Sequence, residues 1–290
     1  MILLAADHFV KAPGWTWLIL AYFFLAGLSG GSYALGAMLR IFGGPADARA
    51  ARVAFLVAFP LVVLCPILLT VDLGQPVKFW HMVVDSASGG LIFKYWSPMS
   101  LGVWGLGTYS FFAFASFLEA LYRPLRDLFR GLLGTLVTAI GAIFGLFVCA
   151  YTGVLLSVSS QPVWSDGWPL GGLFLASALS GAAALLLLLA AWDRGEVATS
   201  IAALLEADRY FVIIESVLVL VFLATVALAG TVGRLFSGVG IVLWLIVLVG
   251  LAVPFFGHSR TRNLSPLVTS AVALAGVLAL RAVVIFGAQS

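Results

Sequence analysis

The sequence predicts an all-α integral membrane protein with eight transmembrane helices, and three observations predict it. Of the 290 residues, 63% are hydrophobic and 9% are charged, whereas a soluble domain carries roughly a quarter charged residues. The mean hydropathy is +1.16. Continuous apolar stretches follow one another, each about as long as the roughly 20 residues that span a bilayer. The strands of a membrane β-barrel would instead alternate over about ten residues.

The apolar stretches occupy most of the chain and leave only short connections. The first is too long for the apolar core of a signal peptide, and Asp7 offsets Lys11 where a basic segment is expected, so we interpret it as a mature helix. A break over 192–208 favours two four-helix bundles. We expect residues 1–192 to hold the first four helices plus the fifth, and 193–290 the last three, in one membrane domain without a soluble domain. The stretches cover residues 15–39, 53–71, 98–120, 131–157, 171–192, 210–229, 238–256 and 264–286.

The lysines and arginines near the helix ends predict the orientation, because positively charged loops tend to stay cytoplasmic. The loops after the first, third, fifth and seventh stretches hold ten of these residues, and the opposite side holds five. Both termini and the loops 72–97 and 158–170 are therefore expected on the non-cytoplasmic side. The expected location is the inner (cytoplasmic) membrane, with a multi-pass chain surrounded by lipid. No basic run is present, so nucleic acid is not an expected partner.

Few ionisable residues lie within or at the ends of the apolar stretches, where such groups are costly and are functional candidates by default. Asp72 follows the second stretch and opens a segment that also holds Lys78 and His81. Glu119 and Arg281 lie close enough to helix ends to reach the interface. Glu215 lies more than one turn inside its stretch, where an acid suits either proton uptake or a hydrogen bond to a neighbouring helix.

Two tyrosines fall at a depth similar to that of Asp72 on the same predicted side. Tyr151 lies about two turns before the end of the fourth stretch, and Tyr22 about two turns into the first. A phenol in an apolar cavity can hydrogen-bond a quinone carbonyl while a carboxylate or imidazole relays the proton to water. A purely structural role for both tyrosines remains open from spacing alone.

Several electron-carrying groups are excluded by residue type. The histidines are His8, His81 and His258, and all lie outside the apolar stretches, so axial ligands for a transmembrane haem are missing. Cys65 and Cys149 fall short of the four thiolates that hold an iron–sulfur cluster. Haem and iron–sulfur clusters are therefore not expected in this chain, and any electron carrier must be diffusible or belong to another polypeptide.

A set of short motifs resembles the NrfD/PsrC family, the quinone-reactive membrane subunits typified by polysulfide reductase. The most specific motif is Asp72-Leu73-Gly74-Gln75-Pro76 with Phe79-Trp80-His81. The others are Gly27-Leu28-Ser29-Gly30-Gly31, Ser97-Pro98-Met99-Ser100, and Tyr151-Thr152-Gly153 with Leu155-Leu156-Ser157. The resemblance is densest over the first four helices. It departs from the family just before the first glycine-rich motif, where relatives can carry His or Asn and this sequence has Ile19, Leu20 and Tyr22.

The resemblance implies a membrane subunit of a respiratory oxidoreductase complex. Such a subunit exchanges electrons and protons between menaquinone or ubiquinone and a four-cluster ferredoxin-like iron–sulfur subunit on the non-cytoplasmic face. That partner connects to a molybdopterin or multihaem catalytic subunit. The implied quinone-binding residues are Tyr151, Tyr22 and Asp72, the implied catalytic proton carriers are Asp72 and His81, and the implied docking residues are Lys78, Trp80 and Trp96.

Two other functions remain open from the sequence. In the first, Glu119 and Glu215 form a cytoplasmic half-channel of a proton-translocating subunit. In the second, the chain is a passive membrane anchor that binds no quinone.

Overall fold

The computed structural model describes residues 13–85, 89–129, 131–192, 201–257 and 265–289, and these residues are mainly helical. Seven helices are long and apolar enough to cross a membrane, and an eighth apolar helix is shorter. This confirms the predicted all-α membrane fold with eight helices. A short helix α4 (Arg123–Leu128) and the 3₁₀ segments η1 (Pro45–Asp47), η2 (Pro76–Met82) and η4 (Val232–Phe236) lie between them. The eight long helices are α1 (Trp17–Phe42), α2 (Ala48–Asp72), α3 (Pro98–Leu121), α5 (Leu132–Ser157), α6 (Leu170–Trp192), α7 (Ile201–Leu228), α8 (Gly240–Gly257) and α9 (Pro266–Gly287).

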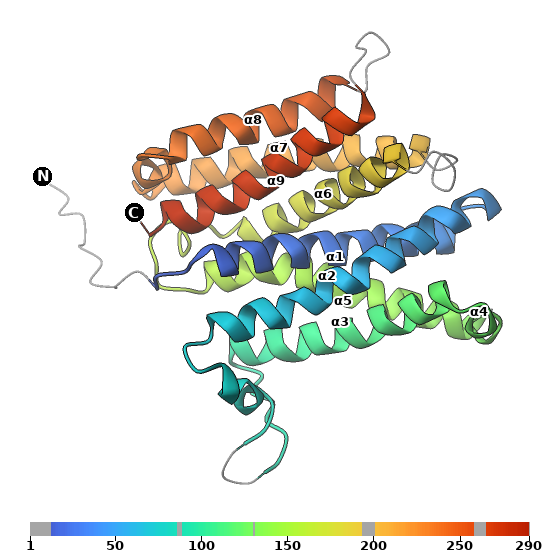
Figure 1. The fold of residues 1–290 in the computed structure, drawn as a ribbon. Helices are drawn as coiled ribbons and strands as arrows, with labels where there is room; N and C mark the ends of the chain where they lie inside the picture. Colours follow the sequence, from blue (N-terminus) through green and yellow to red (C-terminus); the bar gives the residue numbers. More distant parts are fainter. Residues whose placement is uncertain (1–12, 86–88, 130, 193–200, 258–264, 290) are drawn as a thin grey trace, which may run out of the picture.

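By their contacts the long helices form two groups of four (Figure 1). In the first group α1 contacts α2, α2 contacts α3, α3 contacts α5, and α5 contacts α1. In the second, α6 contacts α7, α7 contacts α8, α8 contacts α9, and α9 contacts α6. Helix α6 also contacts α1 and α5. Because α6 belongs to both contact sets, the division at residue 192 stays a prediction.

Helices α1 and α6 form the centre of the molecule. In their most apolar windows 72% and 78% of the residues are buried, against 28% for α2, α3 and α7. A helix that faces other helices on most of its sides is buried all round, whereas a peripheral helix turns its apolar side chains to lipid. The peripheral helices therefore supply the lipid-facing surface.

Two helices begin earlier than the apolar stretches predicted. Helix α2 begins at Ala48 rather than at residue 53, and α7 begins at Ile201 rather than at residue 210. The added turns carry charged residues, among them Arg49, Arg52 and Asp208, which hydropathy assigns to loops. A helix can continue beyond the apolar region through charged residues. The predicted apolar stretches therefore mark where α2 and α7 enter the apolar region and not where the two helices begin.

The glycine-rich segment of α1 brings three helices together. A Cβ atom on Gly30 would collide with the backbone carbonyl of Gly145 in α5. A Cβ atom on Gly31 would lie 2.6 Å from the Ala178 carbonyl oxygen in α6. Small residues let helix backbones approach closely in a membrane, where van der Waals contact rather than water exclusion holds helices together. The segment therefore acts as the joint between the two groups.

One end of the molecule is closed by contacts between distant segments. The backbone N–H of Trp15 donates to Gln289 Oε1 at 2.7 Å. The rings of Trp15 and Trp164 stack at 4.9 Å, and Trp164 Nε1 donates to the Val284 carbonyl at 2.7 Å. These contacts tie the start of α1 and the α5–α6 loop to the end of α9.

A helix-joint prediction follows from the Gly30 contact. We expect Gly30→Ala to lower the stability of the purified protein by about 1 to 3 kcal/mol, because overpacking forces α1 and α5 apart. Gly107→Ala is the matched control, because a Cβ atom there meets nothing within 4 Å and alanine favours helix. Thermal unfolding in detergent compares the two, and equal stabilities would contradict the joint.

Candidate quinone site

Helix α1 presents a row of polar side chains on one face. Tyr22, Ser29, Tyr33 and Arg40 follow one another at spacings of seven, four and seven residues, which bring side chains back to the same face of an α-helix. Tyr22, Ser29 and Tyr33 are buried, and Arg40 is half-buried at the opposite end of the helix. The row therefore crosses most of the first helix group.

Helix α3 supplies a partner for three of these side chains. The hydroxyls of Ser29 and Tyr109 lie 2.8 Å apart, and those of Tyr33 and Ser116 lie 2.7 Å apart. Ser29 also donates to the Ala58 carbonyl of α2 at 2.7 Å. At the Arg40 end of the row, the polar pair is ionic. Stacked hydroxyl pairs thus line the interior, and hydrogen bonding satisfies groups that lipid cannot solvate.

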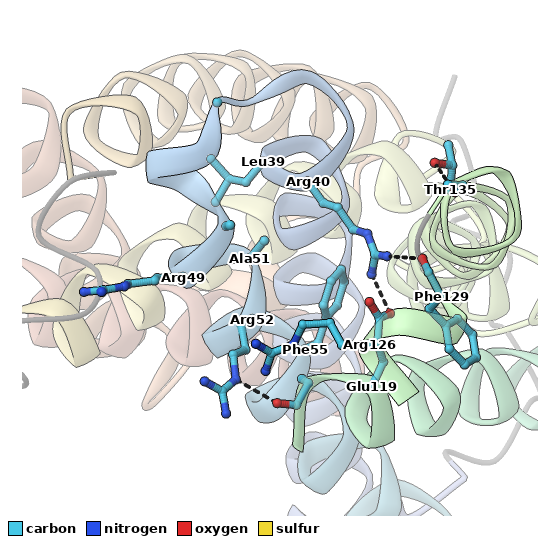
Figure 2. A pocket seen from close by; sticks show the side chains of 14 residues that line it. Leu39, Arg40, Arg49, Ala51, Arg52, Phe55, Glu119, Arg126, Phe129 and Thr135 are labelled. Atoms are coloured by element: carbon cyan, nitrogen blue, oxygen red, sulfur yellow. Dashed lines mark hydrogen bonds and ion pairs between the residues drawn. The ribbon is translucent and has the colours of Figure 1, made fainter. Parts of the chain in front are cut away.

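Glu119 closes the row at the end where arginines gather. Its Oε2 atom lies 2.6 Å from Arg40 Nη1, and the Arg40 Nη2 atom donates to the Phe129 carbonyl at 3.1 Å (Figure 2). The sequence-based expectation was that Glu119 itself reaches the interface. The structure instead buries its carboxylate and pairs it with Arg40, which is half-buried at that end. An acid held in this way lies between the hydroxyl row and a solvent-accessible pocket.

The opposite end of the row holds the two tyrosines that the sequence singled out. Tyr22 lies within electrostatic range of Tyr151 and Cys65. The Tyr151 hydroxyl donates to the Pro98 carbonyl at 2.7 Å, and its ring lies against Gly102, where a Cβ atom would collide with it. Tyr22 makes no hydrogen bond with the residues that the structure describes. The structure therefore brings both tyrosines together and leaves Tyr22 as the free phenol.

Asp72 lies nearer the membrane edge than these tyrosines. It ends α2, two turns or about 10 Å beyond Cys65, which is at the level of Tyr22. Its Oδ1 atom accepts a hydrogen bond from Thr16 Oγ1 at 3.2 Å, and Thr16 is the N-cap of α1. Asp72 is therefore half-buried between the end of α2 and the start of α1.

His81 belongs to a different set of contacts. It lies in η2, where its Nδ1 atom is 3.2 Å from the Lys78 carbonyl and its ring stacks on Trp80 at 3.7 Å. The contacts described for His81 include neither Asp72 nor a tyrosine. The two predicted proton carriers thus lie on different elements, Asp72 at the end of α2 and His81 in η2.

The loop from Gln75 to Ser97 carries the predicted docking residues at the molecular surface. Lys78 is exposed, and Trp80 and Trp96 are 43% and 67% exposed. The described parts of this loop, residues 75–85 and 89–97, project from the end of the first helix group in Figure 1. Other apolar side chains on it are also exposed, namely Val77, Phe79, Leu91, Phe93 and Tyr95.

A second polar network lies between α6, α7 and α9. Arg281 is completely buried and donates to Ser177 Oγ at 3.0 Å, to the Phe23 carbonyl at 3.3 Å and to the Val277 carbonyl at 3.1 Å. The expectation that it reaches the interface is therefore wrong. Gly27 makes room for it, since a Cβ atom there would lie 2.7 Å from Arg281 Nη2.

Glu215 lies in this second network, away from Glu119. Ser177, Ser180 and Arg281 face its carboxylate, and its Oε2 atom has no hydrogen-bond partner in the described part of the chain. Asp208 lies two helical turns before Glu215 on α7, and its carboxylate accepts a hydrogen bond from Ser180 Oγ at 3.3 Å. Glu119 and Glu215 thus belong to separate helix groups rather than to a single described channel.

Comparison with known proteins decides the family. A family model described as polysulfide reductase, of the NrfD type, matches residues 8–290. The chain belongs to the NrfD polysulfide reductase family. It is also similar to Protein NrfD of Escherichia coli K12, with 29% identity over 208 residues, which are 63% of this chain and 61% of that protein. The chain thus spans less than two thirds of the length of this curated relative.

In this NrfD-family protein the sequence motifs pointed to the ends of helices and did not include the interior pairs. Tyr33, Tyr109 and Ser116 were not singled out, although the seven- and four-residue spacing on α1 and the seven-residue spacing from Tyr109 to Ser116 were visible. Arg281 was singled out only as a residue that could reach the interface, and Asp208, between Glu206 and Arg209, was assigned to a charged loop.

The buried guanidinium generates a stability prediction for this NrfD-family chain. Arg281→Lys keeps the positive charge, but an ammonium cannot reproduce the four hydrogen bonds that the planar guanidinium makes. We therefore expect the free energy of unfolding to fall by at least about 1.5 kcal/mol. Arg49→Lys is the control, because Arg49 is exposed and we expect a change within about 0.5 kcal/mol. Chemical denaturation in detergent measures both. Equal tolerance would show that the fork geometry is unimportant.

Proposed function

We propose that this NrfD-family protein is the quinone-reactive membrane subunit of a respiratory oxidoreductase complex. The quinone is the substrate: it takes up two electrons and two protons to become quinol, or the reverse. The free Tyr22 hydroxyl beside Tyr151, at the end of the helices where Asp72 lies, is the observation that carries the proposal.

The two tyrosines are suited to different states of the substrate. Tyr22 has an uncommitted O–H that can donate to a quinone carbonyl. Tyr151 already donates its proton to Pro98, so its oxygen is available to accept a hydrogen bond from a quinol hydroxyl. In this proposal Asp72 moves protons between the headgroup and the aqueous edge, and His81 on the loop is a later carrier.

Electrons reach the quinone from a partner subunit. We infer that a four-cluster ferredoxin-like iron–sulfur protein docks on the Gln75–Ser97 loop, with Lys78, Trp80 and Trp96 in the contact. That protein in turn serves a molybdopterin or multihaem subunit. Exposed aromatic side chains concentrated on one loop support a protein interface, because such residues are enriched at the centres of interfaces.

The proposed location is the inner membrane, with both termini and the docking loop on the non-cytoplasmic side. The ten-to-five distribution of basic residues supports this orientation. The passive-anchor alternative differs in one observable, because an anchor retains no quinone after purification.

A hydroxyl-deletion series tests the quinone site in the assembled complex. We expect Tyr22→Phe to weaken apparent quinone affinity by about two- to twelve-fold, the value of one hydrogen bond. Compared with Tyr22→Phe, Tyr151→Phe should change quinone affinity less and thermal stability more, because the Tyr151 hydroxyl already donates a hydrogen bond to the Pro98 carbonyl. Tyr122→Phe, exposed at the other end of α3, is the control. Steady-state kinetics with a short-chain quinone measures the series, and unchanged affinity for Tyr22→Phe would remove Tyr22 from the site.

A second prediction concerns Asp72 as the proton carrier. Asp72→Asn keeps the shape and can still accept from Thr16 but loses the base, so we expect quinone turnover to fall by about 10² to 10⁴. Electron transfer from the catalytic subunit to an artificial dye should continue. Thr16→Val is the matched variant, because it removes the hydrogen bond and leaves the carboxylate. If Asp72→Asn turns over at the normal rate, proton transfer runs elsewhere.

A second candidate function is proton translocation through the first helix group. The hydroxyl pairs Ser29–Tyr109 and Tyr33–Ser116 between Glu119 and Tyr22 favour it, since aligned hydroxyls can relay protons. This route uses Glu119 but leaves Glu215 in the separate network.

Tyr33→Phe tests this candidate, because it removes one hydroxyl of the row and keeps the ring. With the complex in liposomes, we expect proton uptake from the Glu119 side to fall about tenfold or more while electron transfer continues. Tyr122→Phe again serves as the control. Normal proton uptake in Tyr33→Phe would leave the row with a structural role only.

A further inference from the structure

A pocket of about 540 Å³ lies at the arginine-rich end of the first helix group. It is formed by the ends of α1, α2 and α3 together with α4 and the start of α5 (Figure 2). Its volume falls within the range of roughly 300 to 1,000 Å³ that is typical of small-molecule sites. The pocket lies at the opposite end of the helices from the proposed quinone site.

The pocket carries an excess of positive charge. Four arginines line it, Arg40, Arg49, Arg52 and Arg126, against the single carboxylate of Glu119, which leaves a formal charge of +3. Asp47 and Asp127 are near in sequence but do not line it, and Asp47 Oδ2 accepts from the Gly44 N–H.

The guanidinium groups differ in how far they are already engaged. Arg40 is bound to Glu119 and Phe129, and Arg52 donates to the Ala120 carbonyl through Nε at 2.7 Å. Arg126 and Arg49 make no hydrogen bond or ion pair within the described ranges. Arg49 belongs to the lining, but its side chain points away from the other three arginines in Figure 2. Gathered cations repel one another, so an anion is the ligand that this arrangement stabilises.

The chemistry of the lining selects a phosphate group. An arginine offers several N–H donors in a planar fork that matches phosphate oxygens. The surroundings select an amphiphile, because Leu132, Leu136 and Leu128 beside the pocket are 74%, 49% and 62% exposed. Basic pockets between transmembrane helices are suited to the head groups of anionic lipids.

We propose that this pocket binds the phosphate of an anionic phospholipid from the adjacent leaflet, with the acyl chains lying along the exposed leucines. Arg126 and the free atoms of Arg52 contact the phosphate, and Glu119 stays paired with Arg40. Arg49 adds its charge to the attraction for the phosphate without contacting it. The proposal is independent of the quinone site, which lies at the other end of the helices.

Lipid retention by the purified full chain tests the pocket. The chain is reconstituted into phosphatidylcholine nanodiscs with and without phosphatidylglycerol, and native mass spectrometry counts the lipid retained after transfer to detergent. One basic side chain is worth about five-fold in affinity for an anionic lipid, so Arg49→Gln with Arg126→Gln should weaken phosphatidylglycerol retention about 30-fold. Neither residue has a described partner, so we expect the variant to fold. Should the double variant not be recovered, Arg126→Gln alone should weaken retention about five-fold.

A matched control separates a site from general surface attraction. Lys78→Gln with Lys94→Gln removes the same charge at the opposite end and should retain phosphatidylglycerol as the wild type does. An equal loss in this control, or full retention in the arginine variant, overturns the proposal. Inorganic phosphate is the third arm: if it stabilises the lipid-free wild type as strongly as phosphatidylglycerol does, the ligand is a soluble phosphate and the lipid assignment is wrong.

Discussion

The close approach of α1 to α5 and α6 is the constraint on which the rest of the structure depends. Gly30 and Gly31 allow backbone contact on two sides of α1, and Gly27 leaves the space that Arg281 fills from α9. In a bilayer, apolar side chains gain little by leaving lipid for a helix interface, so association rests on such close contact and on polar pairing. The glycine segment therefore joins the two helix groups and fixes the rotation of α1.

That rotation determines where the polar face of α1 points. With the glycines turned toward α5 and α6, Ser29 and Tyr33 meet the hydroxyls of α3, and Arg40 meets Glu119. Each buried polar group needs a partner because the hydrocarbon region holds no water. The first helix group uses mainly neutral pairs, whereas the second group buries a guanidinium and two carboxylates, which is the more expensive arrangement.

The candidate quinone site was only partly accessible from the sequence. Depth along each helix follows from counting residues. Counting placed Tyr22, Tyr151 and Asp72 at one level, whereas in the structure only the two tyrosines lie together and Asp72 lies two turns nearer the membrane edge. Counting residues could not show that the Tyr151 hydroxyl donates to the Pro98 carbonyl or that His81 stacks on Trp80. Both contacts depend on the backbone conformation at a helix end or in a connecting segment. The interior hydroxyl row had a periodic signal on α1, but its partners depend on the register between α1 and α3.

The sequence by itself determined the fold class, the number of helices and their approximate positions. Those properties depend on local hydropathy, since a segment of sufficient apolar length is stable across a bilayer whatever its neighbours are. Only the tertiary structure decided that Arg281 is buried rather than interfacial, that Glu119 and Glu215 lie in separate networks, and that four arginines share one pocket. Each of these depends on the rotation of a helix about its axis, which is set by close packing against other helices rather than by hydropathy.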